Sequence, residues 1–359
     1  MTTMIEFEKT SIVFGGEPER ALPLMDQGKT RSEVQVATGQ VLGVHDCSLS
    51  VRQGEISVLM GLSGSGKSTL LRAINGLNPV VRGRVLVRGK DGAMVDVVSC
   101  SPESLRGLRR GAVAMVFQQF ALLPWRSVVE NVALGLELAG MGKEERLAKA
   151  REVLATVNLT DWAEKKVSEL SGGMQQRVGL ARAFATDAEI LLMDEPFSAL
   201  DPLIRNRLQD ELLMLQDKMH CTIVFVSHDL EEAVKLGNVI TIMEGGRIVQ
   251  TGAPEDIVLR PANGYVADFV AHLNPLSVLT ATDAMVADAG PAVPERSLAP
   301  GAPLKEALPF FAASPDPVWV VEDGATVGKI TSRSVYTLLA RESAGAPEGS
   351  PPALPETAA

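Results

Sequence analysis

Short apolar runs alternate with amphipathic stretches along the central part of the chain, from Val44 to about Thr251. Apolar or β-branched runs of strand length are typical of strands that are buried on both faces in α/β domains. We expect such strands at Ile56–Met60, Ala112–Phe117, Ile190–Met193 and Thr222–Val226. The amphipathic stretches predict helices at Lys67–Asn75, Lys143–Val157, Met174–Phe184 and Leu203–Met219. The pattern therefore predicts an α/β fold.

Three further segments extend this pattern within the first domain. A short strand is expected at Ile5–Phe14, followed by an insertion over residues 15–43 that contains one helix near Arg31–Ala37. Residues 243–249 have apolar flanks around Gly245-Gly246 and predict a hairpin. We place the first domain at residues 1–275.

The amino-acid composition of the sequence changes after Asn274-Pro275. Residues 280–303 are rich in Ala and Pro, and residues 304–340 have the pattern of one helix–strand–strand–helix unit. Residues 342–359 consist mainly of Pro, Ala, Gly and Glu, and we expect them to be disordered. A small second module is therefore predicted at residues 276–341, with a tail at 342–359.

Charge and composition exclude several classes of protein. The net charge of −10 and the lack of a basic stripe argue against a nucleic-acid partner. The scattered Cys47, Cys100 and Cys221 suggest reduced thiols of the cytoplasm rather than a disulfide framework. No signal peptide is apparent, and no apolar run approaches the ~18 residues that a membrane span needs. If the chain serves transport, we expect other chains to form the pore.

A glycine-rich loop follows the first buried strand and opens a helix. It fits the pattern G-x-x-x-x-G-K-[ST], whose backbone N–H groups point at phosphate oxygens. The helix start adds partial positive charge. A lysine in this position reaches the β- and γ-phosphates, and the following hydroxyl ligates Mg²⁺. The predicted ATP-binding residues are Gly61, Leu62, Ser63, Gly64, Ser65, Gly66, Lys67, Ser68 and Thr69.

Two acids end another buried strand. Asp194 stands where a carboxylate can hold Mg²⁺ through water, and Glu195 stands where a general base can polarise the attacking water. Phosphoryl transfer needs both a metal and a group that positions water. The alternative is a strand that merely reaches solvent. Beside the phosphate loop, the pair indicates a nucleotide-hydrolysing site.

A second candidate anion site precedes the helix near Met174–Phe184. A serine, two glycine N–H groups and a helix start can all donate to an anion. The alternative is a plain helix cap, because serine is a common N-cap residue. The residues of this motif are Leu170, Ser171, Gly172, Gly173, Met174 and Gln175.

The order of these motifs resembles the nucleotide-binding domain of ABC transporters over roughly residues 1–272. The resemblance also includes Gln118, His228 and the run Ser198, Ala199, Leu200 and Asp201. It implies a P-loop NTPase with a RecA-like core, an antiparallel β subdomain and a helical signature subdomain at about 118–175. It further implies a head-to-tail homodimer that binds two ATP molecules with Mg²⁺. Ser171–Gly173 of one subunit would face the phosphate loop of the other.

The resemblance implies roles for four more residues. Gln118 resembles the switch glutamine that touches Mg²⁺ and water, although Gln119 is a rival. His228 resembles the switch histidine that contacts the γ-phosphate, with a structural histidine as the alternative. Asp201 resembles the acid that links the two active sites, and it can also cap a helix before Pro202. Phe14 resembles the aromatic residue that stacks on adenine, with a core phenylalanine as the alternative.

The subfamily is indicated by the insertion at 15–43 and by the segments 70–78 and 117–126. They resemble the ATPase subunits of quaternary-amine importers, which take up choline, glycine betaine or proline betaine, and the choline type in particular. This implies a permease, a periplasmic or extracellular solute-binding protein, and a place on the cytoplasmic face of the membrane. Trp125 is expected to be exposed toward the permease, with a buried tryptophan as the alternative.

Two other functions remain open. One is an importer ATPase for another small solute such as an amino acid. The other is a non-transport ABC ATPase of the kind that acts on DNA. Such proteins usually separate the phosphate loop from the signature motif by long coiled coils, and no heptads occur here.

The second module resembles a single, degenerate cystathionine-β-synthase (CBS) unit. The resemblance lies in residues 283–285, 304–308 and 317–332. It implies either a regulatory role or a structural role in dimerisation.

Overall fold

The structure is a computed structural model that describes residues 2–117, 121–198, 200–271, 273–287 and 294–343. It divides into two compact units, Met1–Thr251 and Gly252–Ala359. The sequence placed the boundary after residue 275 instead. The predicted and the observed boundary differ because α11 (Pro254–Leu259) and α12 (Gly264–Val270) belong to the second unit. Leu259, at the end of α11, packs against the apolar core of the second unit.

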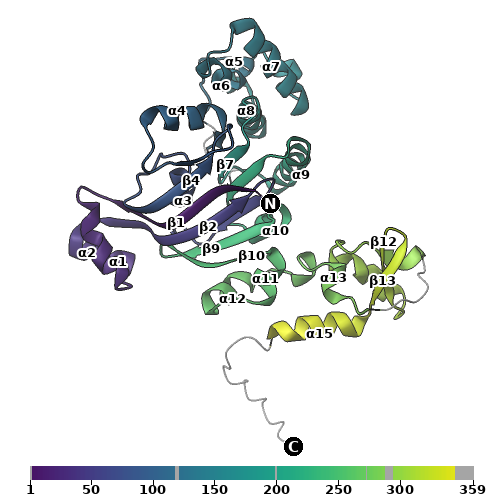
Figure 1. Cartoon of the computed structure of the whole chain (residues 1–359). Helices are drawn as coiled ribbons and strands as arrows, with labels where there is room; N and C mark the ends of the chain where they lie inside the picture. Colours follow the sequence, from purple (N-terminus) through teal and green to yellow (C-terminus); the bar gives the residue numbers. More distant parts are fainter. Residues whose placement is uncertain (1, 118–120, 199, 272, 288–293, 344–359) are drawn as a thin grey trace, which may run out of the picture. The chain divides into compact units, whose positions relative to one another are not determined.

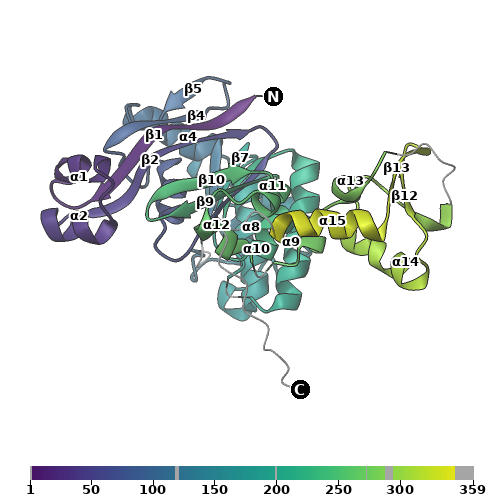
Figure 2. The same ribbon diagram turned by 90° about the horizontal axis from the view of Figure 1, so that it is seen from below.

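The first strands of the chain form an antiparallel sheet in the order β2-β1-β4-β5 (Figure 2). Its strands are β1 (Thr3–Phe14), β2 (Val41–Arg52), β4 (Arg82–Arg88) and β5 (Met94–Asp96). The predicted strand Ile5–Phe14 lies within β1 and is confirmed. Alternate side chains of β1, such as Ile5 and Phe7, are buried in the main core. This sheet is the antiparallel β subdomain that the sequence predicted.

A second sheet lies in the centre of the first unit, in the order β10-β9-β3-β8-β7-β6. The pairs β9–β3, β3–β8, β8–β7 and β7–β6 are parallel. All five residues of β3, β7 and β8 are buried, as their apolar sequences require. The strands are β3 (Ile56–Met60), β6 (Val113–Val116), β7 (Ile190–Asp194), β8 (Thr222–Val226), β9 (Val239–Glu244) and β10 (Arg247–Gly252). The four predicted strands and the hairpin are thus confirmed.

Helices accompany the parallel strands and also form a group of their own. Those that accompany the strands are α3 (Lys67–Ala73), α4 (Pro102–Gly111), α9 (Pro202–Met219) and α10 (Leu230–Leu236). The group comprises α5 (Val128–Val132), α6 (Leu134–Leu138), α7 (Lys143–Thr156) and α8 (Gly172–Phe184), with the 3₁₀ helices at Thr160–Trp162 and Val167–Glu169. α5, α7 and α8 share one apolar core, and Figure 1 shows the group gathered above β7. This group corresponds to the helical subdomain predicted at about 118–175, but α8 extends it to Phe184.

The insertion packs against the ends of β1 and β2 (Figure 1). It contains a 3₁₀ helix at Pro18–Ala21, α1 (Leu22–Asp26) and α2 (Arg31–Thr38). The sequence predicted α2 but not the two short helices before it. Met25, Val34 and Leu42 are fully buried together. The insertion is therefore a packed part of the unit.

The second unit has a small core around a three-stranded sheet, β11-β12-β13. Its strands are β11 (Ser297–Leu298), β12 (Val318–Glu322) and β13 (Ala325–Ile330). Its later helices are α13 (Ala281–Ala284), α14 (Leu308–Ala313) and α15 (Ser332–Ser343), with 3₁₀ helices at Pro275–Ser277, Pro294–Arg296 and Leu304–Ala307. The predicted order of helix, strand, strand and helix is confirmed over residues 304–340. None of the helices in the described ranges is long and apolar enough to cross a membrane.

Candidate functional site

The carboxyl ends of β3, β7 and β8 meet at one edge of the parallel sheet. The phosphate loop, Glu195 and His228 follow these three strand ends in the sequence. Glu195 donates its backbone N–H to the carbonyl of Val226 at 3.2 Å, and Ser227 donates to Leu59 at 3.1 Å. Open α/β sheets bind ligands at such an edge, because the loops that leave parallel strands converge there. The topology thus brings motifs from distant parts of the sequence together.

The phosphate loop has a backbone that its glycines make possible. Gly61 and Gly66 have φ values of +139° and +105°, which side chains rarely adopt. A Cβ at Gly61 would lie 2.1 Å from the carbonyl oxygen of Met243, and one at Gly66 would lie 2.8 Å from Val44 Cγ1. Gly66 immediately precedes α3, so the loop presents the start of this helix to a ligand.

Lys67 is folded back over this loop. Its Nζ donates to the carbonyls of Gly61 at 2.8 Å and Leu62 at 3.1 Å, and the side chain is buried. Burial lowers the pKa of Lys67, while the charges of Glu195 and Asp194 act in the opposite direction. The ammonium group therefore stands in the site with backbone carbonyls as its hydrogen-bond acceptors.

Asp194 is the buried acid of the site. The Ser68 hydroxyl donates to its Oδ1 at 2.6 Å, and the Arg72 guanidinium donates to its Oδ2 through Nε at 3.1 Å and a terminal nitrogen at 2.8 Å. The sequence linked Ser68 and Asp194 only through a common metal. It missed Arg72, although this residue lies one helical turn after Ser68 and on the same face.

Glu195 has an unusual backbone for a residue with a side chain, at φ +46°. Such a conformation costs of order 1–3 kcal/mol and is concentrated at functional sites. His228 Nδ1 lies 3.4 Å from Glu195 Oε2. The turn after β7 thus directs the predicted base toward the predicted switch histidine, and Ser198 Oγ donates to the Glu195 carbonyl at 3.0 Å.

The phosphate loop and Glu195 line a cavity of about 240 Å³, whereas His228 and Ser198 lie beside Glu195 outside this lining. Phe14 lies at one part of its wall, with 38% of its surface exposed, while Lys67, Ser68 and Glu195 form another. The remaining lining residues are Arg31, Val41, Leu42, Gly43, Ser63, Gly64, Gly66 and Thr69. The cavity therefore combines an exposed aromatic ring, a phosphate loop and an acid.

The residues of the signature motif do not line this cavity. Ser171 occupies the N-cap position of α8, but its side chain makes no capping hydrogen bond. Gln175 Nε2 instead donates to the carbonyls of Val167 at 3.2 Å and Leu170 at 3.1 Å, which closes the loop before the helix. A plain helix cap therefore does not account for Ser171. Met174 packs on the apolar core of the helical group.

Asp201 does act as a helix cap. Its Oδ1 accepts the backbone N–H of Ile204 at 3.0 Å at the start of α9. The role that the sequence offered as an alternative is thus confirmed, and it leaves the second carboxylate oxygen for other partners. Gln118 and Ala199, with the rival Gln119, lie outside the described residues.

Arg205 in α9 is a further residue that no sequence motif indicated. It donates to Asp229 Oδ2 at 2.9 Å and to the Leu200 carbonyl at 3.3 Å. The segment that carries His228 is therefore tied to the segment that precedes Asp201. The sequence places Arg205 one turn after the N-cap of a helix, and this position alone does not predict an ion pair with Asp229.

Comparison with known proteins identifies the family of this chain. The protein-family model for the ABC transporter family matches residues 44–198. The chain is 49% identical over 283 residues to the glycine betaine/proline betaine transport system ATP-binding protein ProV of Escherichia coli, covering 79% of this chain and 70% of the relative. It is 39% identical over 332 residues to the trimethylamine N-oxide transport system ATP-binding protein TmoW of Ruegeria pomeroyi, covering 92% of this chain and 95% of the relative.

One solved structure is similar over a large part of the chain. It is the dimeric post-hydrolysis state of the ATP-binding cassette MJ0796 bound to ADP and phosphate, with a TM-score of 0.57 and 30% identity. It covers 70% of this chain and 99% of that chain. The chain described here belongs to the family of ABC transporter ATP-binding proteins.

Proposed function

We propose that this chain is the ATP-hydrolysing subunit of an importer for a quaternary amine. The observation that carries the proposal is the single cavity that collects Phe14, Lys67, Ser68 and Glu195. The curated relatives named for glycine betaine and proline betaine transport supply the solute class. Choline belongs to the same class, and the segments 15–43, 70–78 and 117–126 favour it.

ATP occupies this cavity in our proposal. The N–H groups of the phosphate loop and the Lys67 ammonium hold the phosphates, and Phe14 stacks on adenine. The exposure of Phe14 supports this role, because a core phenylalanine would be buried. When ATP binds, a phosphate replaces the backbone carbonyls as the hydrogen-bond acceptor of Lys67. This anionic partner offsets the free-energy cost of burying the ammonium group.

The residues present fit Mg²⁺. Ser68 and Asp194 offer oxygen donors 2.6 Å apart beside the phosphate loop, and Gln118 is the third predicted ligand. The described residues contain no group of three or more His, Cys, Asp or Glu side chains that could hold a metal alone. Mg²⁺ suits such a site, because it takes few protein carboxylates and completes its shell with water and phosphate oxygens. When bound, it neutralises charge on the phosphates.

Hydrolysis is assigned to Glu195 and His228. Glu195 orients and deprotonates the attacking water, and His228, 3.4 Å away, stabilises the γ-phosphate side of the reaction. The strained turn at Glu195 holds the carboxylate at the sheet edge rather than in bulk solvent. The Lys67 ammonium offsets the negative charge that develops on the phosphoryl oxygens.

Two copies of the chain complete two sites in this proposal. Ser171, Gly172 and Gly173 stand apart from the cavity of their own chain, and the Ser171 hydroxyl is not used as a cap. A second copy that presents these donors would close the γ-phosphate side of the site. The dimeric state of the related cassette supports this arrangement. Asp201 then lies at the junction of the two sites.

The partners in the proposal are a permease at the membrane and a solute-binding protein outside it, with this chain on the cytoplasmic face. Trp125 supports a permease contact, because 70% of its surface is exposed. Lys166 Nζ donates to the Trp125 carbonyl at 2.9 Å and fixes the backbone at this point. Cross-linking of Trp125→Cys to a co-expressed permease tests the contact, and a product with Leu138→Cys alone would contradict it.

The second unit is proposed to be a CBS-like module for regulation or dimerisation. Its helices and three-stranded sheet enclose their own core, which includes Leu304, Val318 and Ile330. Deletion of residues 276–359 should change the ATPase response to salt or to nucleotide ligands if the module regulates. An unchanged response with weaker dimerisation would leave only the structural role.

Co-purification followed by reconstitution tests the function as a whole. The chain should retain a multispanning permease, and with its binding protein the complex should hydrolyse ATP faster when choline, glycine betaine or proline betaine is added. If only an amino acid stimulated ATP hydrolysis, the transported solute would be an amino acid rather than a quaternary amine. Activity without any permease partner, or with DNA, would contradict a transport function.

A further inference from the structure

A cation from the insertion reaches the phosphate loop. Arg31 is the first residue of α2, and its guanidinium donates to the carbonyl of Gly64 in that loop and, at 2.9 Å, to the carbonyl of Gly43 in β2. It thereby lines the cavity that also contains Phe14 and Lys67. No motif of the sequence assigns a role to this residue.

Arg31 has no anionic partner within the described ranges. Its acceptors are two backbone carbonyls, and its Nε is buried without a hydrogen-bond partner. The acid in its own first helical turn, Glu33, instead accepts from the Thr30 N–H at 2.8 Å and from Lys29 Nζ at 3.0 Å. A partly desolvated cation is costly unless an anion pairs with it. The positive charge of the Arg31 guanidinium is therefore available to pair with an anionic ligand.

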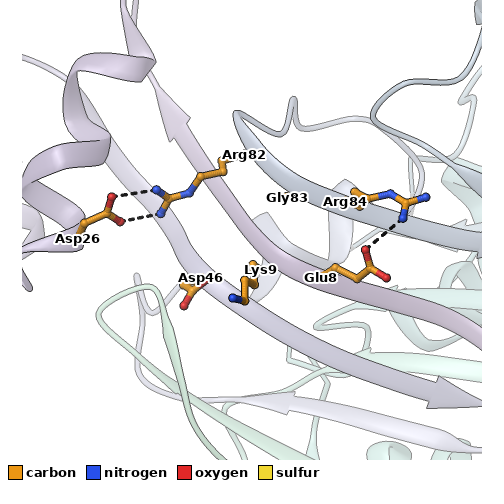
Figure 3. A pocket seen from close by; sticks show the side chains of 7 residues that line it. All are labelled: Glu8, Lys9, Asp26, Asp46, Arg82, Gly83 and Arg84. Carbon is orange, nitrogen blue, oxygen red and sulfur yellow. Dashed lines mark hydrogen bonds and ion pairs between the residues drawn. The ribbon is translucent and has the colours of Figure 1, made fainter.

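Contacts besides those of Arg31 also anchor the insertion. Met25 and Val34 of the insertion are buried against β1 and β2. Asp26, at the end of α1, accepts both terminal nitrogens of Arg82 in β4 at 2.7 and 2.9 Å (Figure 3). This ion pair and the nearby His45 hold the pKa of Asp26 well below its usual range. The insertion therefore presents Arg31 to the cavity from an anchored helix.

We propose that Arg31 is a nucleotide-binding residue that donates to the phosphate chain of ATP. The inference rests on the nucleotide site proposed above and adds to it a cation from outside the family motifs. A guanidinium matches phosphate geometry and forms short charge-assisted hydrogen bonds, which are stronger than those to neutral carbonyls. Binding thus replaces two neutral acceptors by an anion and joins the insertion to the bound nucleotide.

The experiment measures the affinity of the full chain for ATP and ADP by calorimetry. Arg31→Ala should raise the Kd for ATP about tenfold or more, because a charge-assisted hydrogen bond is lost. Arg31→Lys should recover part of the affinity. The matched control is Arg20→Ala in the same insertion, since Arg20 is 64% exposed and pairs only with Glu17 among the described residues. This control should bind ATP as the unaltered chain does.

Two further measurements separate the possible failures. Thermal unfolding without nucleotide shows whether Arg31 merely ties the insertion to the loop: a lower Tm with an unchanged Kd in Arg31→Ala would overturn the inference. Lys67→Ala should abolish ATP binding. Should Lys67→Ala lose binding while Arg31→Ala retains full affinity, the nucleotide site stands and only the role of Arg31 fails. Absence of ATP binding by the unaltered chain would overturn both.

Discussion

Arg205 and Asp229 form an ion pair at 2.9 Å between the first turn of α9 and the N-cap of α10. Arg205 also donates to the carbonyl of Leu200, directly before Asp201. Asp229 follows His228, so one side chain connects the loop after β7 with the loop after β8. The first loop contains Asp201, which we propose to lie at the junction of the two sites, and the second contains His228, which we propose to act at the γ-phosphate. A change in one of them can thus be transmitted to the other.

Arg205→Ala should slow ATP turnover by roughly tenfold while the Kd for ATP stays unchanged. The reason is positional: His228 loses one support, but no group that touches the nucleotide is removed. Steady-state ATPase rates and equilibrium binding measure the two quantities. Arg207→Ala is the control, because Arg207 lies on the same helix with 68% of its side chain exposed. Equal rates in both variants would remove the positioning role.

Glu195→Gln should keep ATP binding and lower turnover by about 10²-fold or more, because the general base is lost while the shape is kept. With Mg-ATP the variant should accumulate as a dimer, since the nucleotide is no longer hydrolysed. Size-exclusion chromatography and an ATPase assay check these outcomes. Glu244→Gln, an exposed acid at the end of β9, is the control.

Ser171→Ala in the Glu195→Gln background tests the proposed interface. It should weaken the ATP-dependent dimer, because we propose that the second copy offers the Ser171 hydroxyl to the nucleotide as a donor. A Glu195→Gln chain that remains monomeric at high concentration with Mg-ATP would contradict the two-site arrangement. So would a dimer that forms equally well without the serine.

The predictable part of the fold is the part that depends on local patterns. The strands β3 and β8 begin and end as expected, because uninterrupted apolar or β-branched residues between turns leave little choice. The helix expected from Met174 begins at Gly172, since the two glycines adopt helical angles in its first turn. The short helix α1 was missed because five residues are too few for a clear period.

The motifs predicted which residues belong to the candidate site, but they did not predict how these residues contact one another. Ser68 and Asp194 are 126 residues apart, and only the order of the parallel strands brings them within 2.6 Å. Arg31 and Arg72 belong to no motif, and their roles arise from tertiary packing. The positive φ of Glu195 could not be predicted either, because a glutamate has no preference for that conformation.

Arg72→Met should destabilise the chain by about 1–3 kcal/mol, because the buried Asp194 carboxylate loses two donors. Turnover should also fall, since Asp194 is then free to change its orientation at the proposed Mg²⁺ site. Urea unfolding gives the free energy of unfolding, and ATPase assays over a range of Mg²⁺ concentrations give the second quantity. Arg52→Met, an exposed arginine at the end of β2, is the control. If both variants have the same stability, the ion pair contributes nothing measurable.

Cys47 and Cys221 should resist alkylation in the folded chain. Burial raises the pKa of each thiol to about 11, from an ordinary value of 9.0. At pH 8 only about one thiol in a thousand is then a thiolate, which is the reactive form. Iodoacetamide should therefore label Cys100, which is only half-buried, before the other two. Mass spectrometry of the labelled peptides gives the order, and rapid labelling of Cys47 under native conditions would contradict it.

The same shifts predict a loss of stability in alkali. A thiol whose pKa is higher in the folded state favours folding fully below pH 9, where both states hold the proton. Between about pH 9 and pH 11 the unfolded chain ionises first, so each buried thiol removes up to roughly 2 kcal/mol from the free energy of unfolding. Urea unfolding at pH 8 and pH 10.5 measures the loss. A Cys47→Ala, Cys221→Ala double variant should lose less between these pH values than a Cys100→Ala control. Equal losses in the two variants would assign the alkaline instability to other groups.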